Sequence, residues 1–300
     1  MIITSEHNVI VQGITGRQGS FWTERMIECG TSVVAGVSPG KGGRTAAGVP
    51  VHDSVAAAAR EHRLDASVLF VPPLAAKTAA LDAIRAGVGR IVLLTEHVPY
   101  QDIMYVLAEA ETYGVNVLGP NTAGLVVPGQ SSVGIMPGFA RNIFQPGRVG
   151  VLSRSGSLGT LVSLNLVGAG YGQSAFVGIG GDPILGTTTV DVVRAFDRDD
   201  RTDAVVLVGE IGGTMEEEAA EYIATMTKPV VAFVAGRSAP PDTRMGHAGA
   251  IVSGTRGTGA SKVEALTAAG STVVDVPGQV PDALRSHGIV PAQNRDRIPA

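Results

Sequence analysis

Cysteine is almost absent from this sequence, and so are long hydrophobic runs and blocks of like charge. The one cysteine, Cys29, excludes an intramolecular disulfide framework, a pattern typical of proteins in a reducing compartment. No stretch reaches the roughly 18 apolar residues of a membrane helix, and residues 1–7 lack the basic region and apolar segment of a signal peptide. We therefore expect a soluble, cytoplasmic protein.

Basic residues are too few and too scattered for a nucleic-acid surface. The 23 lysines and arginines against 27 acidic residues give a formal net charge of −4, so nucleic acid is not an expected partner. Three catalytic or binding signatures are also missing: the G-x-x-x-x-G-K-[ST] phosphate loop, the G-x-S-x-G nucleophile elbow and paired cysteines at metal-binding spacing. We expect no metal site, and no complete site for binding or hydrolysing ATP in this chain alone.

Glycine is abundant, with 40 residues in a chain of 300 whose hydrophobic fraction is 44 %. This length exceeds the usual size of one hydrophobic core, so two domains are expected. Short, continuously apolar runs rich in β-branched residues alternate with helical stretches, which indicates parallel strands covered by helices on both faces. The sequence therefore predicts two doubly wound α/β sheets, joined by an irregular, proline- and glycine-containing connection from Gly119 to Gly147.

The expected domains span residues 1–120 and 148–300, with the connection at 121–147. In the first domain the predicted strands are 8–12, 33–37, 67–71, 91–94 and 116–118, and the predicted helices are 20–29, 55–61, 75–86 and 101–113. In the second domain the predicted strands are 148–152, 175–179, 204–208, 230–234 and 272–274, and the predicted helices are 158–167, 190–196, 216–226, 261–269 and 281–286.

A glycine-rich turn, G-I-T-G-R-Q-G at residues 13–19, joins the first strand to a helix. Unpaired N–H groups and the helix dipole attract phosphate at such a turn. The spacing is G-x-x-G-x-x-G rather than G-x-G-x-x-G, and glycines needed only for close packing of helix on sheet are the alternative.

After the second strand, where NAD sites carry an acidic residue, the chain has Lys41 in a glycine loop. A cation there fits the phosphorylated ribose of NADP or coenzyme A; a solvated lysine is the alternative.

Other segments end strands at the same carboxyl edge, where open α/β sheets bind ligands. In the first domain these are residues 71–73 and 94–96. In the second domain Ser155, Gly156 and Ser157 open a helix and offer hydroxyl and N–H groups to an oxyanion. A simple serine N-cap is the alternative for Ser155.

His247 lies in a run of small residues, G-H-A-G-A at positions 246–250, preceded by Arg244. Small neighbours let the backbone approach a ligand closely and leave the ring free to turn, whereas a solvated loop histidine is the alternative. Glycine turns at 178–183 and 209–213 follow strands of the same sheet and should lie near this loop. Glu210 is thus a candidate to hold the imidazole and raise its basicity; a surface glutamate without a role is the alternative.

The remaining ionisable residues that stand out receive no catalytic role from the sequence. Glu216, Glu217 and Glu218 are expected to form the charged first turn of a helix, which is favourable to its dipole. The other five histidines have no glycine-rich surroundings; they are His7, His52, His62, His97 and His287.

Seven motifs, in order along nearly the whole chain, resemble the α-subunit family of succinyl-CoA synthetase and its relative malate–CoA ligase. They are Q-G-I-T-G at 12–16, P-G-K-G-G at 39–43, G-P-N at 119–121, S-R-S-G at 153–156, G-I-G-G-D-P at 178–183, G-E-I-G-G at 209–213 and R-M-G-H-A-G-A-I at 244–251. The resemblance implies an N-terminal Rossmann-like CoA-binding domain and a C-terminal flavodoxin-like ligase domain. It also implies a β subunit of ATP-grasp type that binds ATP or GTP and Mg²⁺, in a heterodimer or heterotetramer.

By the same resemblance, His247 is phosphorylated and carries phosphate from the nucleotide to a carboxylic acid, and Glu210 holds its ring. Phosphate would bind at Ser155, Gly156 and Ser157, and the acid near Thr160. The implied CoA contacts are Thr15, Gly16, Arg17, Gln18, Lys41, Pro72, Leu94, Thr95, Glu96 and Asn121.

Three positions depart from the family pattern close to where the acid is expected. Thr122 and Ala123 replace the usual cysteine and proline after Gly-Pro-Asn, and Thr160 replaces a tyrosine. We therefore expect the acid to differ from succinate or the specificity to be broader, as in a malate–CoA or other short-chain acid–CoA ligase. Two rivals remain: a CoA-binding protein without catalysis, and an NADP-dependent oxidoreductase, which lacks a recognisable acid–base pair for hydride transfer.

Overall fold

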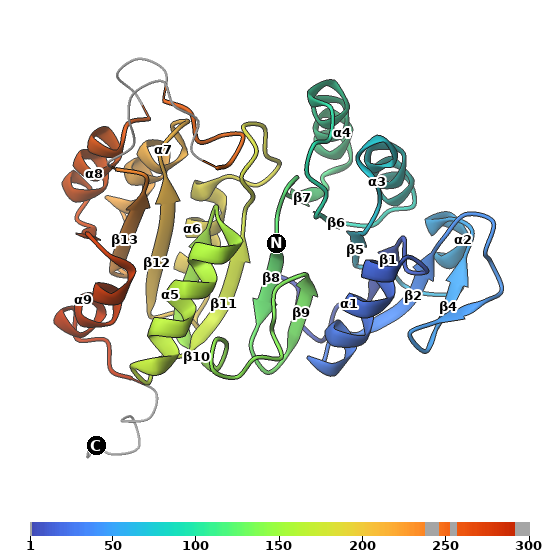
Figure 1. Ribbon diagram of the computed structural model, residues 1–300, viewed down its shortest axis with the longest axis horizontal. Coiled ribbons are helices and arrows are strands. Elements are labelled where there is room, and N and C mark those ends of the chain that lie inside the picture. The colour runs from blue at the N-terminus through green and yellow to red at the C-terminus, as the bar shows by residue number, and fades with distance from the viewer. Residues whose placement is uncertain (1, 238–245, 253–256, 292–300) are drawn as a thin grey trace. The chain divides into compact units, whose positions relative to one another are not determined.

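The structure is a computed structural model in which residues 2–237, 246–252 and 257–291 are described. It has two compact units: unit 1 comprises residues 1–139 and 184–187, and unit 2 comprises residues 140–183 and 188–300. Each unit is built on a mainly parallel sheet flanked by helices (Figure 1). Among the described residues, no helix combines the length and the apolar character needed to span a membrane.

The sheet of unit 1 has the strand order β3-β4-β2-β1-β5-β6-β7, and only β3 runs antiparallel to its neighbour. Strands β2 to β4 lie on one side of β1 and strands β5 to β7 on the other, so the switch point is between β1 and β5, the position at which doubly wound sheets open a ligand crevice. The strands are β1 (Val9–Gln12), β2 (Val33–Val37), β3 (Thr45–Ala46), β4 (Val49–His52), β5 (Ala66–Leu69), β6 (Arg90–Leu93) and β7 (Asn116–Leu118). The helices are α1 (Arg17–Glu28), α2 (Val55–Ala58), the 3₁₀ turn η1 (Pro73–Ala75), α3 (Ala76–Arg85) and α4 (Tyr100–Tyr113).

In unit 2, the described part of the chain forms five parallel strands in the order β14-β13-β12-β10-β11. This is the flavodoxin-like order, with its switch point between β10 and β12. The strands are β10 (Pro146–Ser153), β11 (Gln173–Gly178), β12 (Ala204–Glu210), β13 (Val230–Ala235) and β14 (Thr272–Val274). The helices are α5 (Gly156–Gly168), α6 (Thr189–Asp197), α7 (Met215–Ile223), α8 (Gly259–Ala268), the 3₁₀ turn η2 (Pro277–Gln279) and α9 (Val280–Ser286).

The predicted α/β class is confirmed, and the continuously apolar runs are indeed central strands. All four residues of β1 are buried, as are all seven of β12. Strands 33–37, 116–118 and 272–274 have the predicted bounds, and most other elements differ by one to three residues. Helix α2 ends at Ala58, short of the predicted Glu61.

The prediction of an irregular connection from Gly119 to Gly147 is wrong in part. Strands β8 (Gly124–Val127) and β9 (Ser131–Gly134) form an antiparallel hairpin within it. Glycines mark this hairpin because a Cβ on Gly124, whose φ is +92°, would meet the backbone of the opposite strand. The hairpin belongs to unit 1, where Ser132 N donates to Thr31 Oγ1 at 3.0 Å, just beyond the end of α1.

Strands β3 and β4 were also not predicted. Pro50 interrupts the apolar pattern of β4, and β3 has only two residues, so neither produces a recognisable periodicity. They lie at the edge of the sheet, and the backbone of β4 pairs with the end of β2.

Candidate functional site

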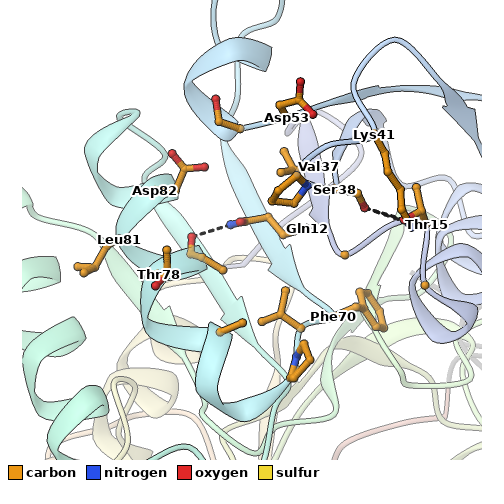
Figure 2. A pocket seen from close by; sticks show the side chains of 18 of the residues that line it. Gln12, Thr15, Val37, Ser38, Lys41, Asp53, Phe70, Thr78, Leu81 and Asp82 are labelled. Carbon is orange, nitrogen blue, oxygen red and sulfur yellow. Dashed lines mark hydrogen bonds between the residues drawn. The ribbon is translucent and has the colours of Figure 1, made fainter.

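The carboxyl edge of the unit 1 sheet contains a cavity of about 880 Å³. Four of the ten predicted CoA contacts line it: Thr15, Gly16, Lys41 and Pro72. Figure 2 shows Lys41, Ser38 and Thr15 grouped on one side of the cavity, with Thr78, Leu81 and Asp82 on the other.

The turn between β1 and α1 leads into a helix whose first amides have no side-chain cap. Gly13 has φ +79°, and a Cβ there would collide with the carbonyl oxygen of Phe70. Gly16 is the N-cap of α1 and provides no side-chain cap for the first amides of the helix. Those amides and the positive end of the helix dipole are therefore available to an anion.

A hydrogen-bonded chain of side chains stands beside this turn. Lys41 Nζ donates to Thr15 Oγ1 at 3.0 Å, and Thr15 Oγ1 donates to Ser38 Oγ at 2.9 Å. Lys41 is thus held next to the α1 N-terminus, where its charge adds to the attraction for phosphate. Val37, Pro39, Val71 and Pro72 supply apolar lining for a planar ring. This combination fits coenzyme A, whose phosphates and adenine need such groups.

The other six predicted CoA contacts do not line this cavity. Arg17 and Gln18 are the exposed first residues of α1. Leu94, Thr95 and Glu96 directly follow β6, where Thr95 Oγ1 donates to the carbonyl oxygen of Val71 at 2.8 Å. Asn121 N in turn donates to Thr95 O at 3.0 Å. Residues 94–96 and Asn121 lie just after the neighbouring strands β6 and β7. Because none of the six residues lines the cavity, their assignment as CoA contacts stays a prediction.

In unit 2 the structure brings four predicted residues to one cavity of about 330 Å³. Its lining includes Ser155 and Ser157 at the start of α5, Glu210 at the end of β12, and His247. His247 Nδ1 lies 2.7 Å from Glu210 Oε2, a short, charge-assisted hydrogen bond. Arg244 and Met245, the first two residues of the histidine motif, lie outside the described residues.

The hydrogen bond to Glu210 raises the pKa of His247 above its ordinary value. The charges of Glu210 and Asp182 raise this pKa further. Burial of the ring and the charge of Arg154 act in the opposite direction and lower it. With the Nδ1 proton shared with Glu210, the lone pair of the neutral ring lies on Nε2. The arrangement yields an imidazole of increased basicity with one nucleophilic nitrogen.

Glycines let the surrounding loops approach the imidazole. A Cβ on Gly181 would lie 2.6 Å from His247 Cγ, so only glycine fits against the ring. Gly249 N donates to Gly181 O at 2.9 Å, which ties the histidine loop to the turn after β11. Gly212, with φ +90°, has no room for a side chain because Gly249 O lies against it. The glycine turns singled out in the sequence therefore meet at His247.

The start of α5 supplies the anion-binding side of this cavity. Ser155 is the N-cap, its Oγ accepting the Leu158 amide at 3.4 Å and lying 3.2 Å from Ser157 Oγ. Ser155 therefore does cap α5, and because it also lines the imidazole cavity its role in binding an oxyanion stays a prediction. Thr160 lies one turn further along α5, where its hydroxyl donates to Gly156 O at 2.7 Å.

Arg154 is a site residue that the sequence analysis did not single out. Its side chain is buried, Nε lies 3.3 Å from Glu210 Oε1, and Nη1 donates to Gly212 O at 3.1 Å. The guanidinium provides a counter-charge for Glu210 and orients the carboxylate toward the histidine. One sequence signal could have indicated it: Arg154 stands between the two serines of the S-R-S-G motif, which directly follows a predicted strand. An arginine that is buried at such a position pairs with a carboxylate.

Residues 216–218 lie in the first turn of α7 as predicted, but the expectation that they only favour the helix dipole is wrong for Glu216. Glu216 and Lys262 are both fully buried and form an ion pair. Glu216 Oε1 also accepts the backbone amide of Glu210 at 3.1 Å. Glu217 lies 3.2 Å from Lys262 and accepts the Gly257 amide at 3.1 Å. This acidic pair and its lysine therefore hold the backbone behind the histidine–glutamate contact.

Two family models match this chain: a CoA binding domain over residues 4–97 and a CoA-ligase over residues 152–272. The α subunit of succinate–CoA ligase (ADP-forming) from Methanothermobacter thermautotrophicus is 49 % identical over 286 residues, covering 95 % of this chain and 96 % of the relative. The α subunit 2 from Archaeoglobus fulgidus is 51 % identical over 95 % of this chain and 98 % of its own length. A subunit of ADP-forming sulfoacetate-CoA ligase from Acholeplasma sp. is 43 % identical over 96 % of this chain and 98 % of its own.

Among solved structures, ATP citrate lyase from Methanothrix soehngenii, in complex with citrate and coenzyme A, shares the fold. Its TM-score is 0.85 at 24 % identity, over 97 % of this chain. The chain spans about half of that longer protein, 52 %.

Replacing Lys262 by methionine should lower the free energy of unfolding by about 3–5 kcal/mol, because Glu216 would remain buried without a counter-charge. Urea unfolding of the two proteins measures the difference. The control is Arg285→Met, which breaks an exposed pair with Asp282 and should cost under about 1 kcal/mol. Equal losses for the two substitutions would contradict a structural role for the buried pair.

Proposed function

Because this chain belongs to the α-subunit family of ADP-forming succinate–CoA ligases, we propose that it is the CoA-binding, phosphohistidine-carrying subunit of an acid–CoA ligase. The observation that carries the proposal is the 2.7 Å contact between His247 and Glu210 in a cavity that also contains Ser155 and Ser157. A CoA-binding protein without catalysis would have no use for this half-buried imidazole and the carboxylate that supports it.

The first half-reaction is phosphoryl transfer to the histidine. His247 Nε2 attacks the terminal phosphorus of ATP or GTP; an N–P bond forms, the P–O bond breaks, and ADP or GDP leaves with the electron pair. Glu210 accepts the Nδ1 hydrogen bond and stabilises the positive charge that develops on the ring. The N-terminus of α5, with Ser155 and Ser157, stabilises the phosphoryl oxygens.

The second half-reaction activates the acid. A carboxylate resists attack by a thiol because it lacks a leaving group, and transfer of the phosphoryl from Nε2 to a carboxylate oxygen supplies one. The CoA thiolate then attacks the carbonyl carbon of this acyl phosphate, the C–O bond breaks, and inorganic phosphate leaves. The covalent histidine intermediate divides one difficult step into easier ones.

Coenzyme A is assigned to the cavity of unit 1. Lys41 and the amides at the start of α1 would hold phosphates, while Val37, Pro39 and Val71 contact the adenine. The nucleotide and Mg²⁺ are assigned to a β subunit of ATP-grasp type, because this sequence has no nucleotide-phosphate loop of its own. The assembly would be αβ or α₂β₂, working in the cytoplasm.

The acid substrate is proposed to be a short carboxylate. The enzyme would either prefer an acid other than succinate or accept a broader range of short acids. Relatives of this chain bear names for both succinate and sulfoacetate ligases, so the family fold serves more than one acid. Thr160 on α5 and the buried Thr122 occupy positions where the family pattern has larger or different side chains. A smaller side chain at position 160 would leave more room for the substrate.

Replacing His247 by asparagine should abolish phosphate labelling of this chain, because asparagine has no ring nitrogen to attack phosphorus. The co-expressed α and β subunits are incubated with ATP or GTP labelled on the terminal phosphate, and acid-labile, alkali-stable label is counted. His287→Asn, which changes an exposed histidine in the same unit, should label normally. Undiminished label on the His247 variant would refute the proposed carrier.

In a plot of the rate of phosphohistidine formation against pH, replacing Glu210 by glutamine should move the rise on the acid side to lower pH. Glu210 raises the pKa of His247, so in the native protein the unreactive imidazolium persists above the ordinary value of about 6.5. Removing the charge lowers that pKa and makes the neutral ring available in more acidic solution, although the maximal rate falls. The rate of phosphohistidine formation against pH measures this, with Glu218→Gln as the control. A rise that stays in place or moves to higher pH would contradict the assignment.

The acid is identified by comparing kcat/KM for thioester formation across succinate, malate, sulfoacetate and other short acids, using the co-expressed subunits. We expect at least one acid to match or exceed succinate. Thr160→Tyr, which restores the family residue, should shift the preference toward succinate, whereas Thr112→Tyr on exposed α4 should not. A native enzyme that prefers succinate to every other acid would refute the altered specificity.

A further inference from the structure

Two histidines that received no role from the sequence lie together in unit 1 with a glutamate. His52 is the last residue of β4, and Glu61 and His62 follow helix α2. A ring nitrogen of each histidine and a carboxylate oxygen of Glu61 lie within 4.8 Å of one another. The turn of the chain through α2 therefore brings three potential metal ligands to one point.

His52 has an unusual hydrogen-bonding state for a largely buried side chain. Its Nε2 is buried and has no hydrogen-bond partner, and its Nδ1 is 4.0 Å from Glu61 Oε1, beyond hydrogen-bond distance. Buried polar atoms are nearly always paired. The ring of His52 therefore has an unusual lack of partners, and its Nδ1, on the side of Glu61, has no hydrogen bond to that carboxylate which an ion would have to break. The ring of His62 stands edge to face with that of His52, with centroids 5.9 Å apart.

The donor set selects the class of ion. Two imidazoles and one carboxylate suit Zn²⁺ and its first-row neighbours, whereas Mg²⁺ and Ca²⁺ prefer oxygen ligands alone. Bonds of about 2.0–2.2 Å require the three ligand atoms to come closer together than they are here. Glu61 can make most of this adjustment because its side chain is 65 % exposed.

We propose that His52, Glu61 and His62 form a binding site for a divalent transition-metal ion of the Zn²⁺ class, with water completing the coordination. The ion would join the end of β4 to the segment after α2. None of the three residues is a predicted CoA contact, so the site is separate from the machinery of the ligase reaction.

The position of the site connects it to the cavity of unit 1. The carbonyl oxygen of His52 accepts the amide of Ser38 at 3.0 Å, and Ser38 Oγ accepts the hydroxyl of Thr15. Asp53 and Ser54, the next two residues, line the cavity itself. A bound ion would therefore restrain one wall of that cavity.

The test uses the full chain without a histidine tag, stripped of metal with a chelator. Titration with Co²⁺ is followed by its visible absorption, and Zn²⁺ affinity is measured by competition with a chromophoric chelator. We expect one ion per chain. His52→Ala and His62→Ala should each weaken binding by about tenfold or more, since loss of a direct ligand costs at least as much as loss of an outer-shell partner.

The matched control is His287→Ala, which removes an exposed histidine from unit 2 and should leave the affinity unchanged. If His52→Ala does not fold, judged by circular dichroism, the more exposed Glu61→Gln and His62→Gln variants decide the matter. The proposal is overturned if the native chain binds no stoichiometric Co²⁺ or Zn²⁺. It is equally overturned if the affinity is the same in the His62 variants and in the control.

Discussion

The contact between His247 and Glu210 is the interaction on which the chemistry proposed for unit 2 depends. It selects the ring nitrogen that is free to react and makes the imidazole more basic. A buried carboxylate is stable only when it is paired, and Arg154 provides the counter-charge at 3.3 Å. The ion pair between Glu216 and Lys262 supports the same strand end from behind. The reactive ring is thus the outermost member of a charged network whose inner members are buried.

Glycine makes this network possible. The loops after β11 and β12 approach the histidine loop so closely that a Cβ on Gly181 or Gly212 would collide with it. Backbone groups can then hold the loop, as Gly181 O does for the amide of Gly249. In unit 1, Gly13 lets the β1–α1 turn pass against the backbone of Phe70, and the first amides of α1 have no side-chain cap. Both candidate sites therefore combine a glycine turn with the N-terminus of a helix.

Much of the fold could be predicted because its signals are local. Fully buried parallel strands must be apolar on both faces, so β1, β2 and β12 appear as unbroken hydrophobic runs. Strand β4 was not predicted because Pro50 interrupts its apolar pattern. The β8–β9 hairpin was not predicted although all its strand residues are buried, because each strand has only four residues and β9 consists of two serines, a valine and a glycine. Helix bounds shifted by a few residues because caps such as Ser155 read equally well as loop residues or as the start of a helix.

By itself, the sequence determined the α/β class, the family and the identity of the histidine–glutamate pair, since motifs in consecutive order carry that information. Only the tertiary structure decided which other ionisable residues meet. Glu216 and Lys262 are 46 positions apart and look like surface residues in their own segments. Arg154 and Glu210 meet because β10 and β12 are neighbours in the sheet, and His52 reaches His62 only because the chain turns through α2. Coulombic pairing and metal ligation act through space, and a linear pattern does not record distances between elements.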